Sequence, residues 1–72
     1  MRLIRLYTEE SLNVDSSVFL IKNSYHYLSK VLRAKENQTI ELFDNSGFSY
    51  FGYVKGITNK SYEIFIEKKI FH

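Results

Sequence analysis

The chain has 72 residues, of which 44% are apolar and 25% are charged, close to the average of soluble globular domains. This apolar content is too high for a disordered tail, and no apolar run approaches the ~20 residues that span a bilayer. Glu9 and Glu10 interrupt the N-terminus before a secretory signal could form, and the absence of cysteine favours a cytoplasmic protein.

The fold must be stabilised by packing alone, because the chain offers neither a disulfide nor a thiolate metal site. Six Tyr and six Phe residues supply large apolar side chains, and we expect most of them in the core. The length is too short for a catalytic domain, so the chain is a binding module, a subunit or a fragment. Ile70 and Phe71 stand next to the end, which favours the fragment; His72 receives no function.

Two strands are predicted in the N-terminal part of the chain. Residues 2–7 form a short strand in which neither face is purely apolar. After a polar loop, residues 16–21 are rich in β-branched and aromatic side chains, and we expect this second strand to be buried on both faces.

One helix follows, beginning at Asn23 or Ser24 as the N-cap and ending near residues 33–35. Its apolar face has helical spacing and consists of Tyr25, Leu28, Val31 and Leu32. Its opposite face is polar and consists of His26, Ser29, Lys30 and Arg33.

Three further strands are predicted after the helix, over residues 39–44, 50–57 and 62–70. The first buries Ile40 and Leu42, and the glycines of the second, Gly52 and Gly56, indicate a bulge or a sharp bend. The predicted fold is a single domain over residues 1–72, mainly β (α+β): a small β-barrel of about five strands with one inserted helix.

The net charge of +2 is small, but the basic residues are concentrated in the first half of the chain. Between Lys22 and Lys35 there are four basic residues and no acidic one. A local basic face can bind phosphate even when the whole domain is near neutral. The alternative is a merely solvated helix surface, since Lys30 and Arg33 also suit a helix C-terminus. Of the two, Arg33 is the better candidate, because a guanidinium can hold a phosphate through two hydrogen bonds.

No catalytic or metal site is indicated. His26 has no second histidine or cysteine nearby in the sequence to complete a metal site. It could contact RNA or simply hydrogen-bond local structure. No nucleophile triad, phosphate-binding loop or dinucleotide motif is present. Aromatic rings could stack on nucleobases, although a marginal domain needs most of them inside.

Three segments resemble the N-terminal domain of the RsmE family, the 16S ribosomal RNA uracil-N3 methyltransferases. They are MRLIRLY at residues 1–7, HYLSKVLR at 26–33 and TIELFDNSG at 39–47. The most specific part is the pattern H-x-x-x-V-L-R, which begins at His26. Ile4 stands where the family usually has proline, and Asn37-Gln38 replaces a usual Gly-(Asp/Glu) turn. Asn37 tolerates the left-handed backbone that glycine adopts, so the turn is expected to be retained.

The resemblance implies a PUA-like β-barrel that binds ribosomal RNA of the small subunit. In this family a C-terminal SPOUT domain follows, which binds S-adenosylmethionine and forms a homodimer; that domain and its cofactor are absent from this segment. The resemblance assigns RNA contact to Arg2, Arg5, His26, Lys30 and Arg33, of which the last three already share the predicted polar helix face.

Two functions remain open. In the first, the chain is the RNA-binding domain of such a methyltransferase and positions rRNA through phosphate contacts. In the second, it is a protein-interaction barrel whose exposed apolar end docks a partner domain or subunit without RNA contact.

Overall fold

A computed structural model describes residues 3–71 of the chain. Its elements are the strands β1 (Ile4–Tyr7), β2 (Ser17–Ile21), β3 (Thr39–Phe43), β4 (Phe48–Ile57) and β5 (Ser61–Phe71), with the helix α1 (Lys22–His26) and a π-helical turn η1 (Tyr27–Val31) between β2 and β3. The expected mainly β fold with five strands and one inserted helix is confirmed.

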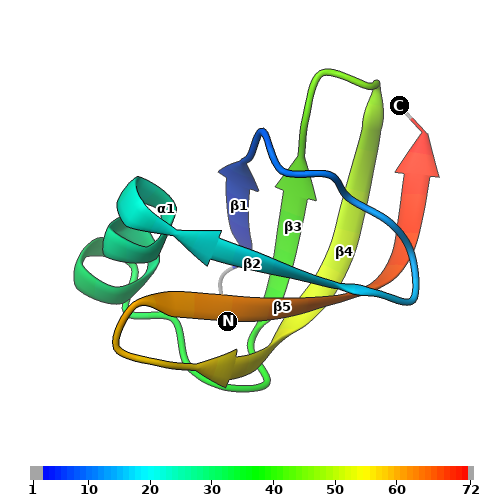
Figure 1. The fold of residues 1–72 in the computed structure, drawn as a ribbon. Coiled ribbons are helices and arrows are strands. Elements are labelled where there is room, and N and C mark those ends of the chain that lie inside the picture. The colour runs from blue at the N-terminus through cyan, green and yellow to red at the C-terminus, as the bar shows by residue number, and fades with distance from the viewer. Residues whose placement is uncertain (1–2, 72) are drawn as a thin grey trace.

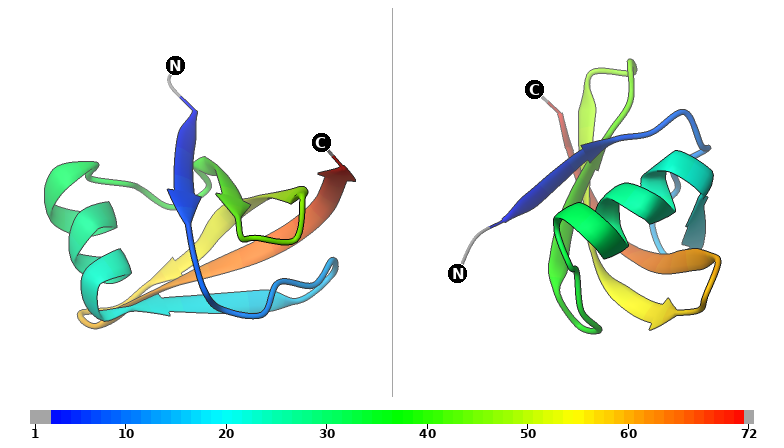
Figure 2. Two further views of the ribbon diagram at one scale, coloured as in Figure 1. Left: turned by 90° about the horizontal axis from the view of Figure 1, so that it is seen from above. Right: turned by 90° about the vertical axis from the view of Figure 1, so that its left-hand side faces the viewer.

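The five strands form one sheet in the order β1-β3-β4-β5-β2. The β1–β3 pair is parallel, and the other three pairs are antiparallel. The sheet curls because β5 bends along its length: its first half lies between β2 and β4, and its second half continues along β4 (Figure 1). Because β1 and β2 are the two edges, the barrel is only half closed. The helical segment packs against β2 and β5 at one end of this half-barrel (Figure 2).

The curl depends on a close approach of β4 to β5 at Gly52. The register of the pair shifts between Phe51 and Gly52, and again between Val54 and Gly56. A Cβ atom on Gly52 would overlap the carbonyl oxygen of Phe65 on the neighbouring strand. Gly52 therefore marks the predicted bulge, where only glycine leaves room for the facing backbone.

The core is mainly aliphatic. Its most deeply buried members come from every strand and from the helical segment: Ile4, Leu20, Leu28, Ile40, Leu42, Val54, Ile64 and Ile66. Among the aromatic residues only Tyr50 and Tyr62 are buried in the described chain. The expectation that most aromatic rings lie inside is therefore wrong, since branched aliphatic side chains already fill the narrow space within the curled sheet.

The expectation that β2 is buried on both faces is also wrong. Val18 and Leu20 point into the core, whereas Phe19 and Ile21 are exposed. The physical reason is that no second layer within the described residues covers the outer face of the sheet. An apolar run of this length does not distinguish a strand covered on both faces from one covered on a single face.

The helix begins two or three residues earlier than predicted and has no side-chain cap. Lys22, its first residue, has a φ of 55°, which turns the chain directly from β2 into α1. Ile21 occupies the N-cap position with extended backbone, because it still pairs with Ser61 of β5. Neither Asn23 nor Ser24 therefore caps the helix.

The π-helical turn changes which side chains face the core. The Leu32 N–H donates to the carbonyl oxygen of Tyr27 at 3.0 Å, one residue farther back than in an α-helix. Each turn then holds an extra residue, so Leu28 and Leu32 both stay on the core side. Val31 is rotated away and is 60% exposed, which corrects its predicted place on the apolar face.

Tyr62 connects the end of the helical segment to the sheet. It is buried on β5, and its hydroxyl donates a hydrogen bond of 2.9 Å to the carbonyl oxygen of Ala34. Burial raises the pKa of the Tyr62 hydroxyl above its ordinary value, and the neighbouring Tyr25 adds to the rise. The folded protein thus favours the protonated phenol that makes this bond.

A first prediction concerns the bulge. Gly52→Ala is expected to lower the free energy of unfolding by roughly 3 kcal/mol or more, because the two backbones must move apart. Gly56→Ala is the matched control: its Cβ would meet only the flexible Glu63 carboxylate, at 3.7 Å. Urea unfolding monitored by circular dichroism compares the two variants. Equal stability of both variants would show that the close approach at Gly52 is unimportant.

A second prediction concerns Tyr62→Phe. At neutral pH the variant is expected to lose about 1 kcal/mol of unfolding free energy, because the buried Ala34 carbonyl loses its donor. Since the folded pKa is raised, the contribution of the phenol is complete below its unfolded pKa of about 10 and is lost as pH rises through the folded pKa. Unfolding measured on both sides of that range is expected to show a larger alkaline loss in the parent than in Tyr62→Phe. Identical alkaline losses would contradict this account.

Candidate nucleic-acid interface

Three of the predicted RNA-binding residues lie together on the helical segment. His26 ends α1, Lys30 lies in η1, and Arg33 follows the helix; all three are exposed. Arg33 has a φ of 53°, and this left-handed residue ends the helix. The next residue then donates a hydrogen bond of 2.9 Å from the Ala34 N–H to the Leu28 carbonyl oxygen. We call His26, Lys30 and Arg33 the basic helix face.

The position of these cations has two physical consequences. They surround the C-terminal end of the helix, where unpaired carbonyl groups favour positive charge. No acidic residue occurs between Lys22 and Lys35, so nothing on the helical segment neutralises them. Lys30 and Arg33 make no ion pair with any residue in the described part of the chain. The basic helix face is therefore open to an anionic ligand.

Arg5 lies elsewhere, on the outer face of the sheet. Its Nε is 3.2 Å from Oε1 of Glu41, which is directly opposite on β3, and its guanidinium lies 5.2 Å from the centre of the Phe43 ring. The Ser49 hydroxyl donates to the other carboxylate oxygen of Glu41 at 2.7 Å. Arg5 thus compensates a buried acidic group, while most of its own side chain remains exposed. Arg2, the fifth predicted residue, lies outside the described residues.

Three further cations that lie over aromatic rings were not singled out in the sequence; one is Lys69, whose Nζ is 4.7 Å from the centre of the Phe48 ring. Lys68 lies 5.6 Å from the centre of the Phe51 ring, and Lys55 lies 5.6 Å from that of Phe65. These pairs depend on the strand register, which places Lys68 opposite Phe51. Alternation within one strand could not reveal them, because each pair joins residues that the sequence keeps apart.

The loop between β3 and β4 is an acidic, ordered turn. Hydrogen bonds from Ser46 to the Asp44 carboxyl lower the pKa of this carboxyl below its ordinary value. The bond from the Ser46 side chain has the largest effect, followed by the bond from the Ser46 backbone N–H. The Asn45 amide donates to the Tyr7 hydroxyl at 3.3 Å, which connects this loop to β1. An ionised carboxylate at the tip disfavours phosphate there.

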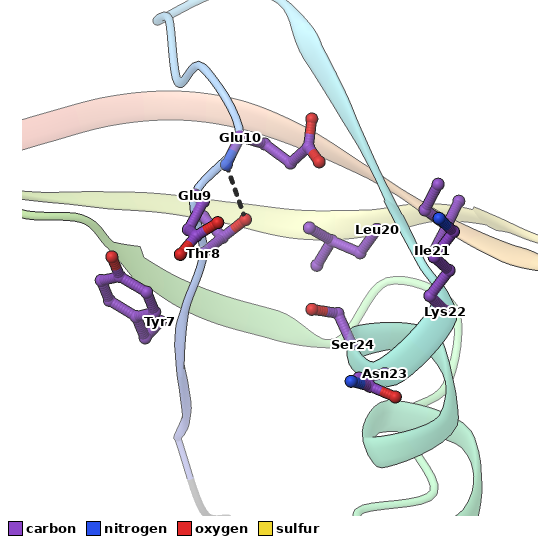
Figure 3. Close-up of a pocket in the computed structure, with 9 residues that line it drawn as sticks. All are labelled: Tyr7, Thr8, Glu9, Glu10, Leu20, Ile21, Lys22, Asn23 and Ser24. Atoms are coloured by element: carbon purple, nitrogen blue, oxygen red, sulfur yellow. Dashed lines mark hydrogen bonds between the residues drawn. The ribbon is translucent and has the colours of Figure 1, made fainter.

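A cleft of about 460 Å³ lies where the half-barrel remains open, between the end of β1 and the start of the helix (Figure 3). Ser24 and Asn23 point into it from α1, across from Thr8 (Figure 3). Glu9 and Glu10 line the same cleft, so it is poorly suited to a phosphate. The cleft adjoins the first turn of the helix, whereas the basic helix face lies toward the last turn.

Two other kinds of feature are absent from residues 3–71. No group of three or more His, Asp or Glu side chains in that range could hold a metal ion. In the same range, no helix combines the length and apolar character needed to cross a membrane.

Known proteins resemble this chain in both sequence and fold. A family model described as the RNA methyltransferase PUA domain matches residues 20–67. Ribosomal RNA small subunit methyltransferase E from Buchnera aphidicola subsp. Schizaphis graminum is 35% identical over 68 residues. That match covers 94% of this chain and 28% of the relative, so the chain spans little more than a quarter of the relative's length.

Two solved structures have the same fold. Ribosomal RNA small subunit methyltransferase E from Neisseria gonorrhoeae, bound to S-adenosyl methionine, superposes with a TM-score of 0.85 at 29% identity, covering 96% of this chain and 29% of that one. A putative methyltransferase from Legionella pneumophila, in complex with the same cofactor, gives a TM-score of 0.88, with 97% and 29% covered. Its 17% identity supports the fold alone.

The family model extends from β2 through most of β5, and so includes the whole helical segment and the bulge at Gly52. Together with the relatives that align over nearly the whole chain, this match shows that the chain belongs to the RNA methyltransferase PUA domain family.

Proposed function

We propose that this chain is the RNA-binding N-terminal domain of an S-adenosylmethionine-dependent 16S rRNA (uracil-N3)-methyltransferase. The observation that carries the proposal is the family match, supported by a relative named ribosomal RNA small subunit methyltransferase E that aligns over 94% of the chain. The unpaired cations of the basic helix face supply the chemistry that RNA binding needs.

In this proposal the basic helix face holds phosphates and orients the RNA. Lys30 acts as a compact charge, whereas Arg33 presents several N–H donors in a planar fork. His26 adds hydrogen-bonding capacity on the same segment, and Arg2 and Arg5 extend the contact from the first strand. Phosphate contacts position the substrate without reading its sequence. The choice of nucleotide therefore belongs to another part of the parent protein.

The remaining parts of the proposal concern the parent protein. Residues 1–72 form one domain, and a C-terminal SPOUT domain follows it and binds S-adenosylmethionine, which supplies the methyl group. The parent acts as a cytoplasmic homodimer on small-subunit rRNA. Support for the cofactor comes from the similar structure from Neisseria gonorrhoeae, which is bound to S-adenosyl methionine and of which this chain covers 29%.

The second candidate is a protein-interaction domain without RNA contact. The observation that favours it is the exposed end of β5, where Phe71 is 70% exposed and Ile70 44%. Phe71 stacks edge-on against Phe48 with ring centres 5.1 Å apart, so the two rings form one apolar surface. Titration of the chain with small-subunit rRNA fragments at two salt concentrations separates the candidates. Absence of binding at both concentrations favours protein interaction.

A third prediction tests the basic helix face. Lys30→Glu and Arg33→Glu are each expected to weaken RNA binding about fivefold or more. Each is also expected to reduce the slope of log affinity against log salt by about 0.7 for every phosphate that the variant no longer neutralises. Lys69→Glu is the control, because it changes the net charge equally at the far end of β5. Fluorescence anisotropy with a labelled rRNA fragment measures both quantities. A uniform effect of all three variants would indicate only net charge and contradict a local contact.

A fourth prediction separates the structural role of Arg5 from its proposed role in RNA binding. Arg5→Gln is expected to lower the free energy of unfolding by about 1 kcal/mol, because the buried Glu41 carboxylate loses its cation. In the double variant Arg5→Gln/Glu41→Gln, much of this loss is expected to be recovered. Urea unfolding of the two single variants and the double variant measures the coupling. If RNA affinity falls in Arg5→Gln and stays low in the double variant, Arg5 itself contacts RNA; recovery of affinity would limit Arg5 to a structural role.

A further inference from the structure

Aromatic side chains occur on all five strands of the outer sheet face, the face opposite the core. The register places Tyr7 opposite Phe43 and Tyr53 opposite Phe65, and directly opposed residues share a face. We call the whole set the aromatic face: Tyr7, Phe19, Phe43, Phe51, Tyr53 and Phe65.

None of these rings is buried. Phe19 is 55% exposed and Tyr7 is 42% exposed, and the other four are half-buried. The aliphatic core is complete without them, so burial of apolar area within this domain does not explain their presence. Exposed and half-buried rings on several neighbouring strands of a small domain indicate a place where something binds.

Cations lie over three of the rings. Arg5 is 5.2 Å from the centre of Phe43, and Lys68 is 5.6 Å from that of Phe51. The third, Lys55, lies over Phe65 and also reaches the Glu63 carboxylate at 3.8 Å. Lys68 makes no ion pair with any described residue. The surface thus combines aromatic rings with cations, of which, among the described residues, Arg5 and Lys55 are paired with Glu41 and Glu63 and Lys68 is not.

This combination distinguishes between two kinds of partner. An apolar protein surface covering the aromatic face would remove water from Lys68 without supplying a counter-charge, which is costly. Single-stranded RNA can contact both the rings and the cations, because its bases stack on rings and its phosphates pair with the cations. Duplex RNA fits less well, since its base faces are already stacked inside the helix.

We propose that the aromatic face binds unpaired nucleotides of single-stranded RNA, with bases stacked on its rings and phosphates next to Lys68 and Arg5. This inference rests on the proposed function in that the chain must bind RNA, but it adds a surface separate from the basic helix face. Two ring pairs offer places for bases: Tyr7 with Phe43, 5.8 Å between centres, and Tyr53 with Phe65, 5.9 Å. Stacking on flat rings tolerates any base, so this surface is expected to show little sequence preference.

The test uses the 72-residue chain and two probes: an unstructured RNA of about ten nucleotides, and the same sugar-phosphate strand without bases. Phe51→Leu and Tyr53→Leu keep an apolar side chain but remove the ring. Each is expected to raise the Kd for the complete RNA at least about fivefold and to leave the Kd for the abasic strand unchanged. Phe71→Leu is the control, because it removes an exposed ring from β5 outside the aromatic face, and neither Kd is expected to change.

The results separate this inference from the proposed function. Lys30→Glu is expected to weaken binding of both probes, since it acts on phosphate. If it does so while Phe51→Leu and Phe71→Leu behave alike, the basic helix face stands and the aromatic face is overturned. Equal loss of both probes in Phe51→Leu also overturns the stacking proposal. Failure of both probes to bind the parent chain rejects the proposed function and the inference together.

A second measurement does not depend on the folding of a variant. Stacked bases shift the ring-proton NMR signals of the residues that they cover. Titration of the parent chain with the complete RNA is expected to shift the signals of Phe51 and Tyr53 and to leave those of Phe71 unmoved. Unmoved signals on the aromatic face at saturating RNA would assign this surface to a protein contact and contradict the proposal.

Discussion

The close approach of two backbones at Gly52 determines most of this molecule. Near Gly52, β5 bends while it stays paired with β4, and its first half also pairs with β2, so that one continuous sheet curls around its own inner face. The curl encloses a narrow space that branched aliphatic side chains fill, and Leu28 seals it from the helical segment. It also determines what remains outside: the cations at the helix end and the rings on the outer strands.

The sequence predicted the elements more accurately than their environments. Local signals were sufficient for the five strands, for the bulge at Gly52 and for the turn at Asn37, whose φ of 69° is the left-handed conformation expected there. The errors at Val31 and Phe19 have a different origin. The error at Val31 depends on a π-helical turn that shifts the spacing, and the error at Phe19 depends on which face of the sheet is covered by the rest of the chain. Both are properties of the assembled fold, which periodicity within one segment does not contain.

The candidate site shows the same division. Helical spacing predicted that His26, Lys30 and Arg33 share a face; all three are exposed within one short segment, although Arg33 follows the helix rather than lying on it. The separate location of Arg5 could not be foreseen, since its partner Glu41 becomes its neighbour only through the parallel pairing of β1 with β3. The left-handed backbone at Arg33 ends the helix, so the Arg33 charge lies at the point where the chain turns away from the helix.

The placement of aliphatic residues in the core and of most aromatic residues on the surface affects the stability of the domain. A domain of this size has little stability to spare, and exposed rings do not add to it as buried ones would. Tyr50 and Tyr62 show that the fold accepts buried aromatic residues, and Tyr62 also satisfies a carbonyl group there. The other rings stabilise the fold less than fully buried rings would, through cross-strand pairs such as Tyr7–Phe43 and Tyr53–Phe65, and they leave apolar surface for a partner. The cations above Phe43, Phe51 and Phe65 also favour binding of an anionic partner, since each places an exposed positive charge next to a ring.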